Sequence, residues 1–255
     1  MAGIQAVAGI EIRQLYDLAD FAEVVRLQEL IWGFDPTDLL PMRFLVVVSR
    51  VGGHVFGAFD GHQMVAFCFA MPGIKPGPRP YLHSHMLGVL PAYRDGGLGR
   101  ALKLRQRAEA LARGIDLIEW TFDPLELKNA FFNIERLGAI VRRYSVNQYG
   151  ITASPLHGGL PTDRCYAEWW TDSARARAVV EGSARPTDPF PAHDAVERIS
   201  YPADMARIRK EERDRACEIQ ARNAGKFQSG FARGLAVTRF QRSETEGTYI
   251  LEPWQ

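Results

Sequence analysis

The chain has 255 residues, of which 46% are hydrophobic and 24% are charged, a composition typical of a globular protein with one large domain or two small ones. Its net charge of +1 provides no overall field for binding nucleic acid or an anionic membrane, so neither is an expected partner. The three cysteines lie far apart, without a CxxC motif or zinc-ligand spacing, which favours a reduced cytoplasmic protein over a disulfide scaffold. We expect no signal peptide, because the N-terminal segment is short and soon acidic, and no apolar run reaches membrane-spanning length.

Hydrophobic periodicity predicts strands interspersed with helices up to residue 170. The predicted strands are residues 10–15, 54–59, 64–70, 81–90, 116–122, 139–146 and 164–170. The predicted helices are residues 21–32, a shorter helix after Pro41, a helix from a glycine-rich loop to about Arg113, and residues 124–138. Asp60-Gly61 marks a hairpin turn, and the proline-rich residues 71–80 indicate a stiff loop. Hairpins together with alternating helices predict an α/β (α+β) fold with a mixed sheet.

The composition changes from Thr171 onward, where small, polar and proline residues indicate a linker. We predict a core domain over residues 1–172, a linker over 173–190 and a C-terminal extension over 191–255. The predicted order in the extension is strand, long charged helix, strand, strand, at residues 197–202, 203–232, 235–240 and 247–253. The extension could complete the acceptor site or build a homodimer.

The loop "RDGGLGR", residues 94–100, fits one of three glycine-loop patterns. A Walker loop requires Gly-Lys-Ser/Thr, but Gly99 is followed by Arg100 and Ala101. A dinucleotide fingerprint requires a third glycine where the chain has Leu102. The pattern Arg/Gln-x-x-Gly-x-Gly/Ala, placed after a strand and a proline and opening a helix, is satisfied without a gap.

This loop has the properties of a diphosphate cradle. Glycines let the backbone turn sharply and approach a ligand, and the following helix offers its positive end. Arg94, Arg100 and Lys103 are placed to add positive charge. The alternative is a tight strand-to-helix turn with solvated arginines, and both interpretations remain open from the loop alone.

The order of elements and the segment "LGVLPAYRDGGLGRAL", residues 87–102, resemble the GNAT acyltransferase superfamily over about residues 8–170. In that family the loop holds the pyrophosphate of acyl-coenzyme A, and the preceding strand splays from the next one so that its free edge pairs with the pantetheine arm. The resemblance therefore implies an acyl-CoA co-substrate, most simply acetyl-CoA. It also implies an N-acyltransferase activity on a primary amine, in a small molecule or a peptide.

The family's contacts can be carried over residue by residue. The resemblance implies that the pantetheine arm contacts Leu87, Gly88 and Val89. It implies that the diphosphate contacts Asp95, Gly96, Gly97, Leu98, Gly99 and Arg100, with Arg94 opening the loop. An N–H near Val89 or Leu90 would stabilise the oxyanion.

Two histidines precede the loop in the same strand. Alternation predicts that His83, His85, Leu87 and Val89 share one face of the strand, opposite Ser84, Met86 and Gly88. An ammonium must lose a proton before it attacks, and histidine, with a pKa of about 6.5, suits that task. The arylalkylamine N-acetyltransferases have the same His-x-His-x-Leu-x-Val sequence, which implies a proton relay. Histidines bonded to core neighbours and a metal site, for which no further matched ligand lies nearby, remain the alternatives.

The chain departs from the family after residue 122. Many members have a tyrosine acid where this chain has Ile134, and an asparagine where it has Leu127. Asn129 and Asn133 could take over coenzyme A contacts, and Tyr149 is the candidate acid, with Tyr144 nearby. Asp123 is expected to cap the following helix. Its alternative role is to bind the acceptor amine.

The sequence therefore predicts direct acyl transfer in a ternary complex of enzyme, acyl-CoA and amine, with no metal. No covalent enzyme intermediate is expected, because no base accompanies Cys68 or Cys165 in sequence. The alternative is a GNAT-fold protein that binds coenzyme A as a sensor or interaction module without turnover.

Overall fold

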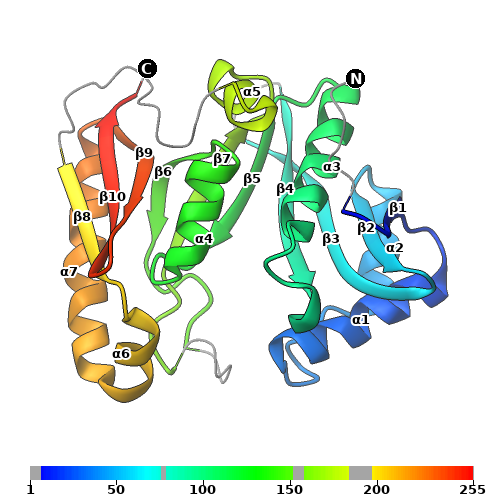
Figure 1. Ribbon diagram of the computed structural model, residues 1–255, viewed down its shortest axis with the longest axis horizontal. Helices are drawn as coiled ribbons and strands as arrows, with labels where there is room; N and C mark the ends of the chain where they lie inside the picture. The colour runs from blue at the N-terminus through cyan, green and yellow to red at the C-terminus, as the bar shows by residue number, and fades with distance from the viewer. Residues whose placement is uncertain (1–6, 76–78, 152–157, 184–196, 255) are drawn as a thin grey trace. The chain divides into compact units, whose positions relative to one another are not determined.

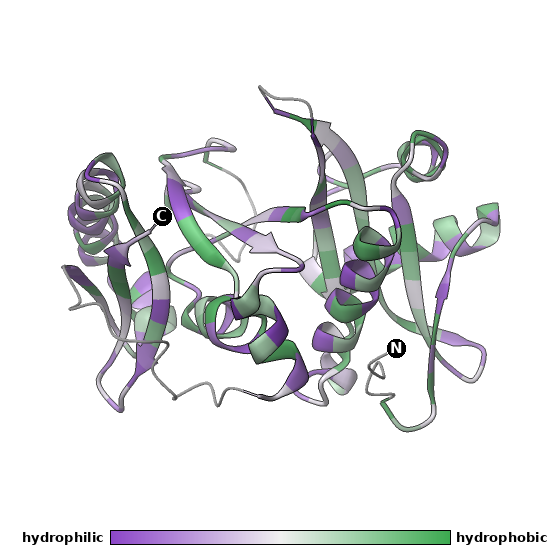
Figure 2. Cartoon of the chain, turned by 90° about the horizontal axis from the view of Figure 1, so that it is seen from above, coloured by the Kyte–Doolittle hydropathy of each residue, from purple (hydrophilic) through white to green (hydrophobic). Residues whose placement is uncertain are grey.

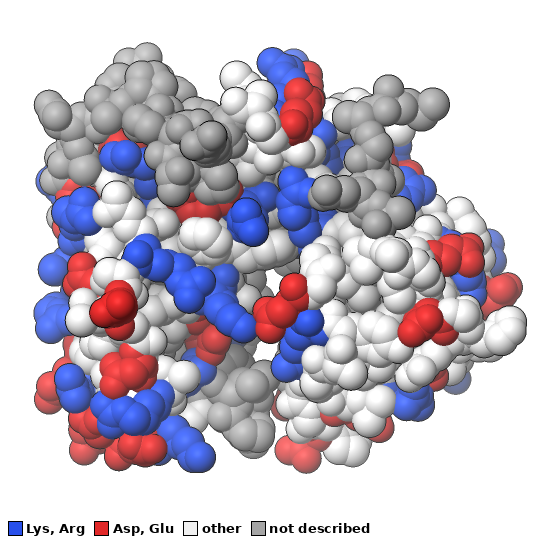
Figure 3. Space-filling model, viewed as in Figure 1, with Lys and Arg blue, Asp and Glu red and all other residues white. Residues whose placement is uncertain are grey.

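A computed structural model describes residues 7–75, 79–151, 158–183 and 197–254 (Figure 1). The chain packs as two compact units, residues 1–119 (unit 1) and residues 120–255 (unit 2). Among the described residues, no helix combines the length and the apolarity that a membrane span requires. On the face drawn in Figure 3, basic and acidic side chains are interspersed, in keeping with the net charge of +1.

Unit 1 is a sheet with helices on both faces. Its elements are β1 (Ile10–Gln14), α1 (Leu18–Trp32), α2 (Met42–Arg50), β2 (His54–Asp60), β3 (Gln63–Ile74), β4 (Pro80–Val89), the 3-10 turn η1 (Pro91–Tyr93), α3 (Leu98–Ala112) and the start of β5 (Leu117–Phe122). The strand order is β1-β2-β3-β4-β5. The first three pairings are antiparallel and the last is parallel.

The core of unit 1 forms on both faces of the central strands. Alternation along β3 places Phe67 and Phe69 in a cluster with residues of α1 and α2, and places Cys68 in a second cluster with Leu98 and Leu102 of α3. Both faces of β3 are buried, which explains its unbroken apolar sequence. In Figure 2 the helices carry bands of both hydropathy colours, as expected of helices with one buried face.

Unit 2 contains the remaining strands and helices. Its elements are the end of β5, α4 (Leu127–Phe131), the π-helical turn η2 (Phe132–Arg136), β6 (Ile140–Ser145), β7 (Arg164–Trp170), α5 (Ala174–Glu181), β8 (Glu197–Pro202), α6 (Met205–Glu211), α7 (Arg213–Ala232), β9 (Leu235–Arg242) and β10 (Glu246–Pro253). The strand order is β5-β7-β6-β9-β10-β8. The C-terminal strands therefore continue the sheet, because β9 pairs with β6 through Val141 and Val237 (Figure 1).

Most predicted strands and the hairpin at Asp60-Gly61 are confirmed. The predicted loop over residues 71–80 is wrong at its start, because β3 continues to Ile74 and Pro72 pairs with Leu82 of β4. The predicted helix over residues 124–138 is a short α-helix followed by a π-helical turn.

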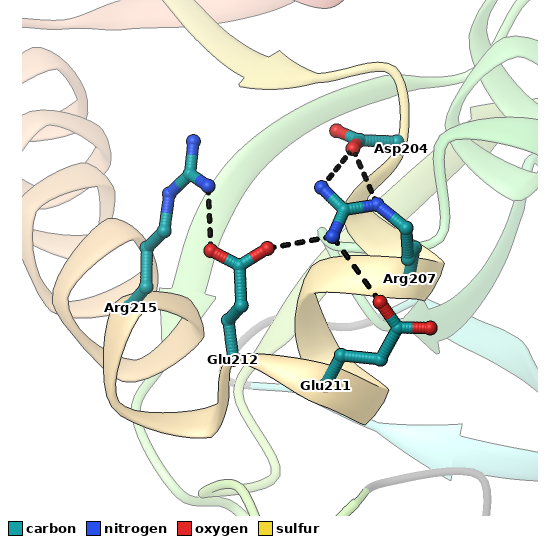
Figure 4. Close-up of polar contacts among 5 residues, drawn as sticks. All are labelled: Asp204, Arg207, Glu211, Glu212 and Arg215. Atoms are coloured by element: carbon teal, nitrogen blue, oxygen red, sulfur yellow. Dashed lines mark hydrogen bonds and ion pairs between the residues drawn. The ribbon is translucent and has the colours of Figure 1, made fainter.

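The long charged helix predicted over residues 203–232 is divided at Glu212, whose backbone leaves the helical region with φ −133° and ψ 57°. The Glu212 carboxylate accepts hydrogen bonds from Arg207 at 2.7 Å and Arg215 at 2.7 Å (Figure 4). Arg207 also binds Asp204 and Glu211. The break is therefore bridged by charges from both helices.

The predicted linker begins with a packed helix, α5, whose first turn is capped by the Ser173 hydroxyl. Arg175 of this helix is 9% exposed and donates to the carbonyl oxygens of Gly138, Ile134 and Thr238. Residues 184–190 of the predicted linker lie outside the described residues. The division into a core over 1–172 and an extension over 191–255 stays a prediction.

Candidate active site

The glycine-rich loop joins β4 to α3 through a sharp turn. Asp95 and Gly97 have positive φ angles of 63° and 84°, and Gly97 precedes the first residue of α3. A Cβ at Gly97 would meet no atom within 4 Å, and one at Gly96 only the Tyr93 carbonyl oxygen at 3.9 Å. The loop is thus an open, exposed turn at the start of a helix whose first N–H groups have no intrahelical partners. This arrangement suits an anion.

Of the three basic side chains predicted to surround the loop, two lie beside it and one is buried elsewhere. Arg94 is exposed, and its Nε donates to the Val89 carbonyl oxygen at 3.1 Å, so it ties the loop to the end of β4. Arg100 lies in the first turn of α3. The prediction for Lys103 is wrong: its side chain is 4% exposed, and its ammonium group donates to Ser84 Oγ at 2.8 Å beneath β4.

The edge of β4 is paired with β5 over a short stretch. The parallel register joins Leu82 to Ile118 and His83 to Glu119. Leu87, Gly88 and Val89, the predicted pantetheine contacts, come later in β4 and are paired with β3. The Leu90 N–H donates to the Val65 carbonyl oxygen at 2.9 Å, which leaves Val89 as the candidate for the oxyanion donor.

A β-bulge in β4 changes the predicted alternation. Ser84 pairs with Ala70 and Met86 pairs with Phe69, so His85 is the extra residue. The His85 ring lies 5.5 Å from the Phe69 ring and 5.7 Å from the His83 ring, which keeps both histidines on the α1/α2 face.

Beyond the bulge the two faces exchange. Met86 packs in the α1/α2 cluster, whereas Leu87 and Val89 pack in the α3 cluster. The prediction that these last two share a face with the histidines is therefore wrong. A Cβ on Gly88 would approach Ile31 within 2.8 Å, because α1 lies directly against this strand.

The two histidines are neutral bases in this setting. His83 is half-buried, and burial, followed by the charge of His85, lowers the pKa of His83 to about 4. His85 reaches the surface, and partial burial lowers its pKa as well. Both rings therefore carry a free lone pair near neutral pH.

An ion pair with a buried carboxylate beside His83 was not predicted from the sequence. Glu119, which is 2% exposed and pairs with His83 across the parallel ladder, binds the Lys75 ammonium. The Glu119 charge raises the pKa of His83 and so opposes the effect of burial. The only signal in the sequence is a glutamate within the apolar strand "LIEWTF".

In unit 2, Tyr149 is half-exposed, and its hydroxyl lies 3.3 Å from the Thr121 hydroxyl. The Tyr144 hydroxyl donates to Asp163 at 2.7 Å, and burial raises its pKa, so this tyrosine keeps its proton. Tyr149 is the more accessible of the two candidate acids.

The remaining candidates have mostly structural contacts. Asn129 is exposed, whereas Asn133 is 3% exposed and accepts a hydrogen bond from the Trp120 indole at 3.2 Å. Ile134 is fully buried. Asp123 accepts the Leu125 N–H at 2.8 Å in the turn before α4. The N-cap of α4 is Glu126, so the prediction that Asp123 caps this helix is wrong. No cluster of three metal-ligating side chains occurs in the described ranges.

Solved structures share this fold. A protein from Desulfovibrio desulfuricans described as a GNAT-family acetyltransferase is 18% identical, with a TM-score of 0.52 over 64% of this chain and 99% of its own. The Escherichia coli ribosomal-protein-S18-alanine N-acetyltransferase is 18% identical, with a TM-score of 0.51 over 65% of this chain and 96% of its own. The protein yncA from Salmonella typhimurium, solved with its cofactor acetyl-CoA, is 18% identical, with a TM-score of 0.51 over 66% of this chain and 98% of its own.

No family model and no curated protein matches the sequence. The chain has the fold of the GNAT acyl-CoA N-acyltransferases, as the resemblance predicted. About a third of this chain lies outside each structural match.

Proposed function

We propose that the protein is an acyl-CoA-dependent N-acyltransferase that transfers an acyl group, most simply acetyl, to a primary amine. The observation that carries this proposal is the open loop of Arg94–Arg100 at the start of α3. This loop follows β4 after the short turn η1, and β4 pairs with β5 over only two residue pairs. Backbone N–H groups of Gly97, Leu98 and Gly99 would hold the diphosphate. The edge of β4 at Leu87–Val89 would pair with the pantetheine amides.

In the proposed reaction the amine nitrogen attacks the thioester carbonyl carbon, and the Val89 N–H stabilises the oxyanion. His85 and His83 accept the proton that the amine loses. The carbon–sulfur bond then breaks, the coenzyme A thiolate leaves, and a proton from Tyr149 or water neutralises it. The products are an amide and free coenzyme A, and all steps occur in one ternary complex.

The acceptor class follows from the same proposal. One similar structure is an N-acetyltransferase that acts on a protein alanine, so a peptide amine is one candidate acceptor and a small-molecule amine the other. We place the protein in the cytoplasm. Homodimerisation and contacts of Asn129 and Asn133 with coenzyme A stay predictions.

A second candidate is a GNAT-fold protein that binds acyl-CoA without turnover. The buried Ile134 favours this binding function, because many family members have at this position the tyrosine that acts as general acid. The paired neutral histidines favour the enzyme instead.

The first experiment tests cofactor binding. Acetyl-CoA at millimolar excess should raise the melting temperature of the wild type, and Gly97→Glu should abolish that shift because a carboxylate repels the diphosphate. Gly61→Glu is the matched control, since Gly61 also has positive φ and open space around its Cβ but lies in the β2–β3 turn. Unchanged binding in Gly97→Glu would contradict the loop assignment.

The second experiment separates enzyme from sensor. A panel of amines, amino acids and peptides is incubated with acetyl-CoA, and free thiol is measured. His85→Ala should lower turnover while leaving the affinity for acetyl-CoA unchanged. Wild-type turnover in the His83/His85 double alanine variant would exclude the proton relay.

A further inference from the structure

A chain of four buried polar side chains crosses unit 1 on the face of β4 opposite the two histidines. Lys103 Nζ donates to Ser84 Oγ at 2.8 Å, and the Ser84 hydroxyl donates to Gln106 Oε1 at 2.8 Å. Gln106 Nε2 lies 3.1 Å from His54 Nε2. Each of the four side chains is at most 4% exposed.

The protonation state of His54 fixes which group donates and which accepts in each hydrogen bond of this network. Burial, followed by the charge of Arg113, lowers the pKa of His54 to about 3, so its ring is neutral and can accept the Gln106 amide N–H. The Gln106 side-chain oxygen then faces Ser84 and accepts a hydrogen bond from its hydroxyl group. Ser84 Oγ presents its lone pairs to Lys103, and every hydrogen bond in the chain has one donor and one acceptor.

Filling the space between α3 and the sheet with this polar network stabilises the fold less than apolar side chains would. Burying an amine costs free energy that a methionine or leucine at the same place would not, and burial lowers the pKa of Lys103 to about 7. The network converges on one residue, Ser84, which lies between the two histidines and is the last paired residue before the bulge.

We propose that Lys103 and Ser84 are positioning residues that lock the β4 bulge at His85 and so keep both histidine rings side by side on the opposite face. The inference rests on the proposed function, in which these rings accept the proton of the amine. A strand that slips by one residue turns every side chain to the other face. Because the Ser84 hydroxyl is held on one side by Lys103 and on the other by Gln106, it cannot turn toward the histidine face.

The same lysine acts on His83 through its charge. Lys103 acts by its charge on His54 of β2, Cys68 of β3 and His83 of β4, and Ser84 of β4 and Gln106 of α3 belong to its hydrogen-bond network. Its positive charge lowers the pKa of His83. His85, Glu119 and Lys75 are the other titratable groups that act on that ring.

The decisive test follows the histidine rings by NMR in the full chain without acyl-CoA or acceptor. In Ser84→Ala and Lys103→Met, the ring signals of His83 and His85 should shift and broaden, and in Lys103→Met the pKa of His83 should rise. Ser84→Thr keeps the hydroxyl and should restore wild-type signals. Thr248→Val is the matched control, because it removes a buried hydroxyl that is bonded to Ser200 at 2.8 Å within unit 2.

Kinetics supply the second readout. Ser84→Ala and Lys103→Met should lower kcat by about 10-fold or more, because small misplacements of catalytic groups are costly. The KM for acetyl-CoA should stay within about twofold, because the loop is untouched. Thr248→Val should change neither.

Unchanged ring signals and an unchanged His83 pKa in both folded variants would overturn the proposal, as would equal shifts in Thr248→Val. If Ser84→Ala does not fold, Ser84→Cys, which keeps the size and weakens the hydrogen bonds, is measured in the same way and decides it. If the wild type transfers no acyl group, the proposed function fails, and the NMR comparison still decides whether the network positions the histidines.

Discussion

Arg209 of α6 and Asp123 at the end of β5 are 86 residues apart in the sequence, and their side chains meet at 3.1 Å in unit 2. The same guanidinium also binds Glu126. Arg209 is 12% exposed and Asp123 15%, so the contact is shielded from water, and burial raises the pKa of Asp123. The C-terminal extension therefore holds the turn that follows β5.

Replacing Arg209 by methionine should cost about 3 kcal/mol of unfolding free energy, because it leaves a buried carboxylate without its partner. Asp123→Asn in the same chain should recover part of the loss. Both are measured by urea unfolding.

Arg207→Met is the matched control, two residues away on the same helix. Arg207 contacts Asp204, Glu211 and Glu212, but all of these charges lie at the surface (Figure 4). Its removal should change stability only slightly, because water screens exposed ion pairs. Equal losses for Arg207→Met and Arg209→Met would show that burial does not decide the strength of these contacts.

His54 should make the protein sensitive to acid. Burial lowers the pKa of His54 from its ordinary 6.5 to about 3, so the unfolded chain binds the proton more tightly than the folded one. The resulting stability is complete above about pH 6.5 and is lost as the pH falls toward 3, by about 2 kcal/mol at pH 5.

His54→Gln should flatten this dependence, since glutamine still accepts from Gln106 but does not titrate. Urea unfolding at pH 7.5 and pH 5 measures the slope, with the exposed His62→Gln as control. His83 contributes in the same pH range, so part of the slope should remain. An unaltered slope in His54→Gln would refute the assignment.

The enzymatic activity should persist at pH values below 6.5, the ordinary pKa of histidine. Burial and then His85 lower the pKa of His83, so His83 stays able to accept a proton as the pH falls through 6.5 toward 4. In His85→Gln the neighbouring charge is lost and the acid limb of kcat/KM should move to higher pH. A limb that stays in place would show that His83 is not the titrating base.

The three thiols should differ in reactivity. Cys68 and Cys165 are fully buried, and burial raises the pKa of both, that of Cys68 to about 12, whereas Cys217 is partly accessible. A thiol reagent should therefore label Cys217 in the native protein and all three cysteines in denaturant. Rapid labelling of Cys68 in the native state would mean that the core under β3 opens.

The features that local sequence determines were predictable. The β2–β3 hairpin follows from Asp60-Gly61, and the loop before α3 follows from the arrangement of Arg94 and its glycines, because backbone conformation at glycine needs no distant partner. The structure confirms these elements and the mixed fold class.

The features that depend on distant partners were not predictable. The bulge at His85 depends on Ser84 being held from α3, and the break at Glu212 is bridged by arginines from two helices. Lys103 falls in a helix of mixed composition, and its sequence position does not show that its amine is buried. Each case requires knowledge of which elements pack together.

The strand order of unit 2 has a consequence for synthesis on the ribosome. β8 ends at Pro202, and its partner β10 begins at Glu246, so β8 emerges long before the strand it pairs with. The pairing of β6 with β9 likewise cannot form until β9 has been synthesised. Folding of this unit cannot finish until β10 has been translated, and the unpaired edges of β6 and β8 are exposed to aggregation during that interval.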